Sequence, residues 1–276
     1  MTIHIVTDST CDLPEETVKS LGITVLPLNI HIGETAYKDG VDISREEFYR
    51  RLHMLDSFPK TASPSPAGFE KLYHRLADEG IKAILSIHIS ETLSATVNEA
   101  RIAAEQFTRI PVTVLDSSQL SLGTGFLVET AAQLSAAGQS LEQILAALKE
   151  QMQRSYVFAS LKTLEYLRRG GRMHSAVAHI GEFFSIKPLL HMNMGKSSVE
   201  RVRTQKRATE QLLTWLEQYA PFERLAVLHA GIQQEAEVLR ESVRAFWPAS
   251  TVPIMQITPA LGAHLGVRSE EHTSEL

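Results

Sequence analysis

The sequence predicts an α/β fold made of two α/β domains. Short apolar runs alternate with amphipathic segments along the chain, and hydroxyl and acidic side chains follow several of those runs. At 276 residues with 43% hydrophobic composition, the chain can bury about two domain cores. Alternating strands and helices are typical of α/β sheets covered by helices.

The elements of the first half follow from apolar periodicity. Strands are expected at 3–9, 23–32, 82–90 and 112–118, and helices at 44–54, 66–78, 92–106, 124–136 and 140–154. Ser65 and Pro66 are typical of an N-cap and a first helical residue, and Ser140 with Gln143 forms a capping box. These signals place the starts of two of the helices.

The second half changes its order of elements. A strand at 156–161 leads to a short helix closed by Gly170 and Gly171, and a helix-like stretch continues to about residue 185. Apolar runs at 186–192 and 198–204 flank Met194 and Gly195 and predict a hairpin. A helix at 205–219, a strand at 224–230, a helix at 233–246 and a strand at 252–258 follow. We therefore divide the chain near residue 155, although no linker composition marks a boundary, and expect the two domains to touch.

Composition excludes several classes of protein. A net charge of −5 argues against a general nucleic-acid binder, because such proteins carry a basic surplus. The single cysteine, Cys11, allows neither an internal disulfide nor a cysteine zinc site. No signal peptide and no apolar run of about 18 residues is found, which predicts a cytoplasmic protein without a membrane span. The eleven histidines show no metal-ligand spacing, and no glycine-rich nucleotide motif occurs, so no metal or cofactor is expected.

The stretch PKTASPSPAGFEKLY contains more hydroxyl groups than a helix start needs. Ser65 explains the cap of the following helix, which leaves Thr61 and Ser63 without a role. One interpretation is helix initiation alone, and the other is a site for an anion at a positive helix N-terminus. Similar hydroxyl-rich motifs follow the strands at 82–90 and 112–118, where open α/β sheets bind ligands.

Basic side chains concentrate in two places. Residues 196–207 contain five basic side chains and one acid, and LRRGGR at 167–172 lies a short way upstream. A solvated surface is the default explanation for such runs, and a docking surface for a phosphorylated ligand or an acidic partner is the competing one.

Eight motifs occur in order along the chain: VTDSTCDLP, KTASPSPAGF, ISETLSATVNEA, VLDSSQLSLGTG, LEYLRRGGR, IKPLLHMNMGK, RVRTQKRA and ITPALGAHLG. Together and in this order they resemble the DegV family of fatty-acid-binding proteins. The resemblance implies two α/β domains, a tunnel for one long-chain fatty acid, and a head-group site between the domains. In bacteria it also implies a separate ATP-dependent kinase subunit that forms acyl phosphate, so this chain is expected to be a carrier without catalysis of its own.

The resemblance also assigns residues. Thr61, Ser94 and His264 match the family positions that meet the fatty-acid carboxylate, and Arg172 and Arg203 match positions concerned with phosphoryl transfer or partner docking. Two departures from the family pattern adjoin these residues. Ala62 replaces the usual serine, and Ala95 replaces the usual glycine after Ser94, which is expected to tighten the backbone at that turn.

Two other functions use the same features. A serine hydrolase would combine Ser94, His264 and Asp116, although TLSAT lacks the Gly-x-Ser-x-Gly elbow. An interaction protein without a small ligand is the second alternative.

The last nine residues form a separate problem. RSEEHTSEL, residues 268–276, interrupts the family pattern and matches the translation of a common sequencing-adapter oligonucleotide. This coincidence predicts a non-native tail and a C-terminal sheet that lacks a strand.

Overall fold

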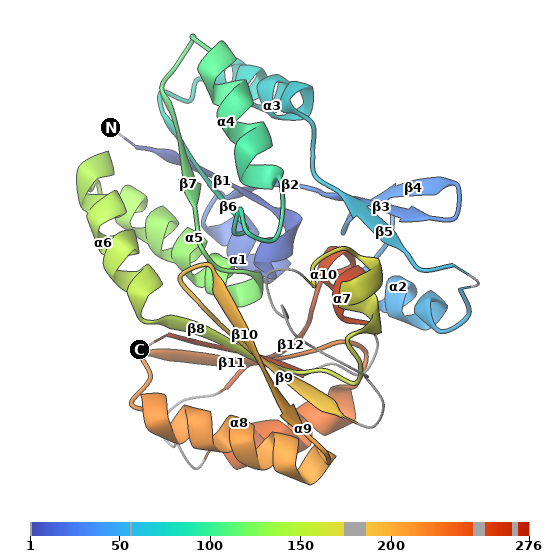
Figure 1. Ribbon diagram of the computed structural model, residues 1–276. Coiled ribbons are helices and arrows are strands. Elements are labelled where there is room, and N and C mark those ends of the chain that lie inside the picture. The colour runs from blue at the N-terminus through green and yellow to red at the C-terminus, as the bar shows by residue number, and fades with distance from the viewer. Residues whose placement is uncertain (1, 56, 174–185, 245–251, 267–269, 276) are drawn as a thin grey trace.

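The computed structural model describes residues 2–55, 57–173, 186–244 and 252–266, together with the backbone of 270–275. Two larger sheets lie at opposite ends of the molecule, and a smaller sheet stands beside them (Figure 1). Helices cover the larger sheets, so the protein has the two-domain α/β fold that the sequence predicts.

The first sheet is parallel throughout. Its strands run in the order β2 (Thr24–Leu26), β1 (His4–Asp8), β6 (Ile84–His88) and β7 (Val112–Asp116). Parallel strands end at the same edge of a sheet, so the hydroxyl-rich loops after β1, β6 and β7 meet there. The predictions of strands at 3–9, 82–90 and 112–118 are confirmed.

The helices of the first half form largely where the periodicity places them. They are α1 (Glu15–Ser20), α2 (Arg45–Leu52), α3 (Pro66–Asp78), α4 (Thr96–Gln106), α5 (Ser121–Ala136) and α6 (Leu141–Gln153), and a short 3₁₀ turn, η1 (Ser9–Cys11), follows β1. Ser65 Oγ accepts a hydrogen bond from Gly68 N at 3.2 Å, which confirms the cap of α3. Ser140 and Gln143 form the expected capping box of α6. The sequence did not predict α1.

The prediction of one strand over 23–32 is wrong. The segment divides into β2, in the first sheet, and β3 (Asn29–Ile32), in a small antiparallel sheet of order β4 (Thr35–Lys38), β3, β5 (Lys60–Ala62). Pro27 stands between the two strands and has no N–H to donate, so a ladder cannot continue through it. The apolar run alone does not show this break, and β4 and β5 were not predicted.

The second sheet has the order β10 (Lys196–Val202), β9 (Lys187–Asn193), β8 (Ser155–Ser160), β13 (Glu270–Glu275), β11 (Arg224–His229) and β12 (Ile254–Gln256). β9 and β10 form the predicted hairpin, and α8 (Gln205–Tyr219) and α9 (Gln233–Val243) lie on the outer face of this sheet (Figure 1). Its first strand begins at Ser155. A domain boundary near residue 155 therefore agrees with the sheets and stays a prediction.

The C-terminal segment does not leave a strand missing. Residues 270–275 form β13, antiparallel to both β8 and β11 in the middle of the second sheet. The expectation that this sheet lacks a strand is thus wrong, whereas the non-native origin of residues 268–276 stays a prediction. The helix-like stretch expected up to residue 185 lies outside the described residues from 174 onward.

Two short helices of the second half complete the fold. α7 (Glu165–Arg169) is the predicted short helix, and α10 (Pro259–Leu265) was not predicted. Although α10 is close to the C-terminus, it packs against α7, α2 and the small sheet (Figure 1). Residues near the C-terminus therefore lie beside β5, a strand from the first half of the chain. Among the described residues, no helix combines the length and the apolar character that crossing a bilayer requires.

Candidate ligand site

A cavity of about 70 Å³ lies between the first sheet, β5, α7 and α10, and it brings together Thr61, Ser94 and His264. Thr61 comes from β5, Ser94 from the loop before α4, and His264 from α10. The rest of the wall is mostly apolar; it consists of Thr10, Leu28, Ile89, Leu93, Leu120, Leu167, Arg172, Ala260, Leu261 and Leu265. Three residues that are distant in the sequence thus share one cavity.

Thr61 and His264 form a direct pair. Thr61 Oγ1 lies 2.7 Å from His264 Nε2, whereas His264 Nδ1 is buried without a hydrogen-bond partner in the described part of the chain. Buried N–H groups without an acceptor are rarer than buried acceptors that go unused, which favours the tautomer protonated on Nε2. In that tautomer Nε2–H donates to Thr61 Oγ1, and the hydroxyl hydrogen of Thr61 is left for a ligand oxygen.

The imidazole is neutral at neutral pH. Burial lowers the pKa of His264, and the positive charge of Arg172 lowers it further, to about 4. The imidazole next to Thr61 is therefore a neutral hydrogen-bonding group rather than a cation.

Ser94 is held by its own turn. Its hydroxyl lies 2.8 Å from Thr96 Oγ1 and accepts a hydrogen bond from Thr96 N at 3.3 Å, at the N-terminus of α4. Ala95 has ordinary right-handed angles, φ −72° and ψ −6°, so the backbone is not strained there, and the expected tightening at this turn stays a prediction. Ala62 is exposed and does not line the cavity.

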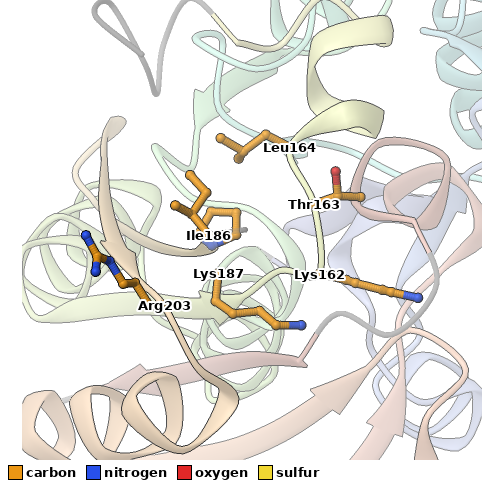
Figure 2. Close-up of a pocket in the computed structure, with 7 residues that line it drawn as sticks. Lys162, Thr163, Leu164, Ile186, Lys187 and Arg203 are labelled. Atoms are coloured by element: carbon orange, nitrogen blue, oxygen red, sulfur yellow. The ribbon is translucent and has the colours of Figure 1, made fainter. Parts of the chain in front are cut away.

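The two arginines are separated. Arg172 lines the same cavity, half-buried, with Nε donating to Leu93 O at 3.2 Å and Nη1 to Gly170 O at 2.5 Å. Arg203 instead lines a different groove of about 320 Å³ with Lys162, Thr163, Leu164, Ile186, Lys187 and Pro188. Figure 2 shows Arg203 and Lys162 on opposite sides of this groove with Lys187 between them. The sequence motifs alone did not distinguish these locations.

A second cavity of about 70 Å³ adjoins the first. The two share the side chains of Leu93, Leu120, Leu167, Arg172 and Leu265. The second cavity continues toward the second sheet, where Val157, Ala159, Leu190 and Met192 line it. The hydroxyl and imidazole groups thus stand at one end of an apolar path. Sequence reasoning missed these wall residues, which are the alternate positions of the predicted strands at 156–161 and 186–192.

The hydrolase triad is not assembled. His264 is bonded to Thr61, and Asp116 Oδ1 accepts hydrogen bonds from Ser118 N at 2.8 Å and Glu91 N at 3.4 Å. Since His264 Nδ1 has no partner among the described residues, no carboxylate orients the imidazole as a general base requires.

A different Asp–His–Ser chain exists, and the sequence analysis missed it. His88 Nδ1 lies 3.0 Å from Asp8 Oδ2, His88 Nε2 lies 2.7 Å from Ser86 Oγ, and Tyr73 OH donates to Ser86 at 3.1 Å. Asp8, Ser86 and His88 are all fully buried, so no ester reaches the serine. Asp8 also accepts from Thr10 N and Ile89 N, which ties this chain to the wall of the first cavity. This buried hydrogen-bond chain therefore connects the interior of the first sheet to the cavity wall.

In the described part of the chain, no group of three or more histidine, cysteine, aspartate or glutamate side chains is placed to hold a metal ion.

Comparisons with known proteins identify the family of this chain. The DegV family model matches residues 2–269. A DegV domain-containing protein of Listeria monocytogenes is 32% identical over 268 residues, which are 96% of this chain and 95% of the relative.

Two solved structures are similar over nearly the whole length. A fatty-acid-binding DegV family protein from Thermus thermophilus has a TM-score of 0.90 and 34% identity, with 100% of each chain covered. DegV from Bacillus subtilis, a fatty acid binding protein, has a TM-score of 0.92 and 29% identity, with 100% of this chain and 99% of that chain covered. By its sequence and by its fold, this chain belongs to the DegV family.

Proposed function

We propose that this chain binds one long-chain fatty acid and presents its carboxylate to a separate ATP-dependent kinase subunit, without catalysis of its own. The observation that carries the proposal is the Thr61–His264 pair beside Ser94 at one end of two adjoining apolar cavities. The fatty acids bound by the related proteins from Thermus thermophilus and Bacillus subtilis support the same ligand class. We expect such a carrier to act in the cytoplasm, because the kinase partner uses ATP there.

The division between tail and head group explains how such a carrier works. Burying about 15 methylenes at ~0.8 kcal/mol each contributes on the order of 12 kcal/mol before the costs of binding. The head group then needs donors that release it when it is phosphorylated. A threonine hydroxyl that a neutral imidazole orients, together with a serine hydroxyl, holds a carboxylate less firmly than a bidentate arginine would.

Loading requires movement of the cavity walls. Each cavity holds about 70 Å³, whereas ligand pockets are usually about 300 Å³ or larger. Leu93 and Leu120 line both cavities and lie outside helices and strands, so we expect their side chains to move when an acyl chain fills the cavities.

Native mass spectrometry of the purified protein tests the proposal directly. We expect the mass of one fatty acid per chain, retained under gentle ionisation and lost when the protein is denatured. A clean apo mass after mild purification from cells, with no uptake of added palmitate, would contradict the carrier function.

The groove around Arg203 supplies the second prediction. Lys162, Lys187 and Arg203 surround it, and such a basic groove suits the acidic surface of a kinase partner (Figure 2). Arg203→Ala is expected to leave palmitate affinity near the wild-type value and to slow acyl-phosphate formation about tenfold, because Arg203 is absent from both apolar cavities. A fluorescent fatty-acid titration and a kinase assay with the partner measure the two effects.

Arg172 is expected to behave differently from Arg203. Its side chain lines both apolar cavities, so Arg172→Ala is expected to alter lipid affinity as well as the rate of acyl-phosphate formation. Arg75→Ala on the exposed side of α3 is the control and should change neither, because Arg75 lies outside the basic run 196–207, both apolar cavities and the groove. Loss of lipid affinity in Arg203→Ala would place Arg203 in lipid binding and refute the docking role.

A further inference from the structure

The helix that carries His264 packs unusually close to its neighbours at glycines. An ideal Cβ on Gly262 would lie 2.3 Å from Tyr49 Oη, on α2. On the opposite side, a Cβ on Gly170 would lie 2.1 Å from His264 Nδ1 and 2.8 Å from His264 Cε1. These separations are far below van der Waals contact, so the imidazole occupies the space that a side chain at position 170 would need.

The two glycines of the Gly-Gly-Arg motif serve different purposes. Gly171 has φ +73° and nothing within 4 Å of an added Cβ, so its conformation needs glycine. Gly170 has ordinary right-handed angles, φ −75° and ψ −4°, which any residue adopts. The atoms nearest to an added Cβ are the two ring atoms of His264, followed by Tyr166 O at 3.1 Å, so the contact with His264 is the main reason for a missing side chain at position 170.

The end of α7 also holds Arg172. Gly170 O accepts from Arg172 Nη1, and Arg172 and His264 both line the first cavity. A substitution that keeps the backbone keeps this carbonyl, so the arginine contact survives while the space beside the imidazole is lost.

We propose that Gly170 is a positioning residue for His264: its missing side chain lets the imidazole lie against the end of α7 with Nε2 on Thr61 Oγ1. The inference rests on the proposed carboxylate site and deepens it. A methyl group at position 170 forces the ring to turn, because the ring is the end of a side chain with two rotatable bonds and yields more easily than the backbone. The Thr61 hydroxyl then loses the group that orients it.

Four variants test the proposal: Gly170→Ala, His264→Ala, the double variant, and Gly68→Ala as control. Gly68 is a helical glycine of α3 whose added Cβ would meet Ser65 Oγ at an ordinary 3.6 Å. We expect Gly170→Ala to weaken palmitate binding about fivefold or more and palmityl alcohol binding less than about twofold. In the His264→Ala background the same change should have no further effect on the acid, because the positioned group is gone.

A spectroscopic measurement separates this role from a general loss of structure. Burial is the main cause of the low pKa of His264, about 4, so turning the ring out of its place should raise that pKa toward the ordinary value. An NMR titration of the His264 ring in wild type, Gly170→Ala and Gly68→Ala measures it. If Gly170→Ala loses thermal stability, the double variant should recover it, since the clashing ring has been removed.

Different results would overturn the positioning role of Gly170 and the carboxylate site on which it rests. An unchanged His264 pKa together with unchanged acid affinity in Gly170→Ala overturns the positioning role. If His264→Ala leaves the preference for acid over alcohol intact, the carboxylate site fails, while the NMR titration still decides whether Gly170 positions the ring.

Discussion

Thr61→Val is expected to weaken fatty-acid binding about tenfold or more while changing the affinity for a fatty alcohol of the same length much less. The substitution keeps the shape of the side chain and removes the hydroxyl that pairs with His264 Nε2 at 2.7 Å. A hydrogen bond to a charged group contributes roughly 1.5–3 kcal/mol, which corresponds to this loss. Parallel titrations with palmitate and palmityl alcohol measure the difference, because only the acid carries the charge.

Ser94→Ala should resemble Thr61→Val, since Ser94 lines the same cavity and loses its hydroxyl at nearly constant volume. Because both hydroxyls would contact one carboxylate, the double variant should depart from additivity. Ser65→Ala is the control. Ser65 Oγ caps α3 and does not line the cavity, so this change should lower stability by ~1 kcal/mol without altering the preference for acid.

Two results would contradict the binding of a carboxylate by Thr61. If Thr61→Val weakens the acid and the alcohol to the same degree, the hydroxyl shapes the cavity and does not bind a carboxylate. If Thr61→Val does nothing and only Ser65→Ala has an effect, the hydroxyl-rich stretch serves helix initiation alone.

His88→Ala is expected to lower the free energy of unfolding by about 3–5 kcal/mol, the usual cost of removing the partner of a buried carboxylate. His88 Nδ1 lies 3.0 Å from Asp8 Oδ2, and both side chains are fully buried. Burial alone would raise the pKa of Asp8, but the hydrogen bond and charge of His88 and the donors of Thr10 and Ile89 outweigh it and lower that pKa below 3.8. The carboxylate is therefore an anion in the folded protein, and the variant leaves it with one donor fewer.

The sign of the pH dependence follows from this lowered pKa. A carboxyl whose pKa is lower in the folded protein stabilises the fold above its unfolded pKa of 3.8, and that stability is lost as pH falls through the folded pKa. In His88→Ala the pKa of Asp8 should rise, so the deficit relative to wild type should shrink on acidification. Urea unfolding of both proteins at several pH values measures this difference in the free energy of unfolding.

Two variants control the stability measurement. Asp8→Asn in the His88→Ala background should recover part of the loss, because it removes the stranded charge. His53→Ala, at an exposed position after α2, should change little. A deficit below about 1 kcal/mol in His88→Ala, constant with pH, would show that Asp8 is not held as an anion by His88.

The sequence predicted the elements that local signals specify. Ser65 with Pro66 and Ser140 with Gln143 mark helix starts through hydrogen bonds within one turn, so these helices begin where expected. The strand over 23–32 was predicted wrongly because an apolar run reports burial and does not report which sheet accepts each half. The helix α10 has only 7 residues, too few for a periodic signal, and it forms because other elements surround it.

By itself the sequence determined the α/β class, the order of most elements, and through its ordered motifs the DegV family with Thr61, Ser94 and His264 as candidate ligand residues. Only the tertiary structure decided that these residues share one cavity, that Arg172 lies with them, and that Arg203 does not. It also revealed the buried pair of Asp8 and His88. The physical reason is range: caps and periodicity act within a few residues, whereas a cavity depends on contacts between segments that only the packed fold brings together.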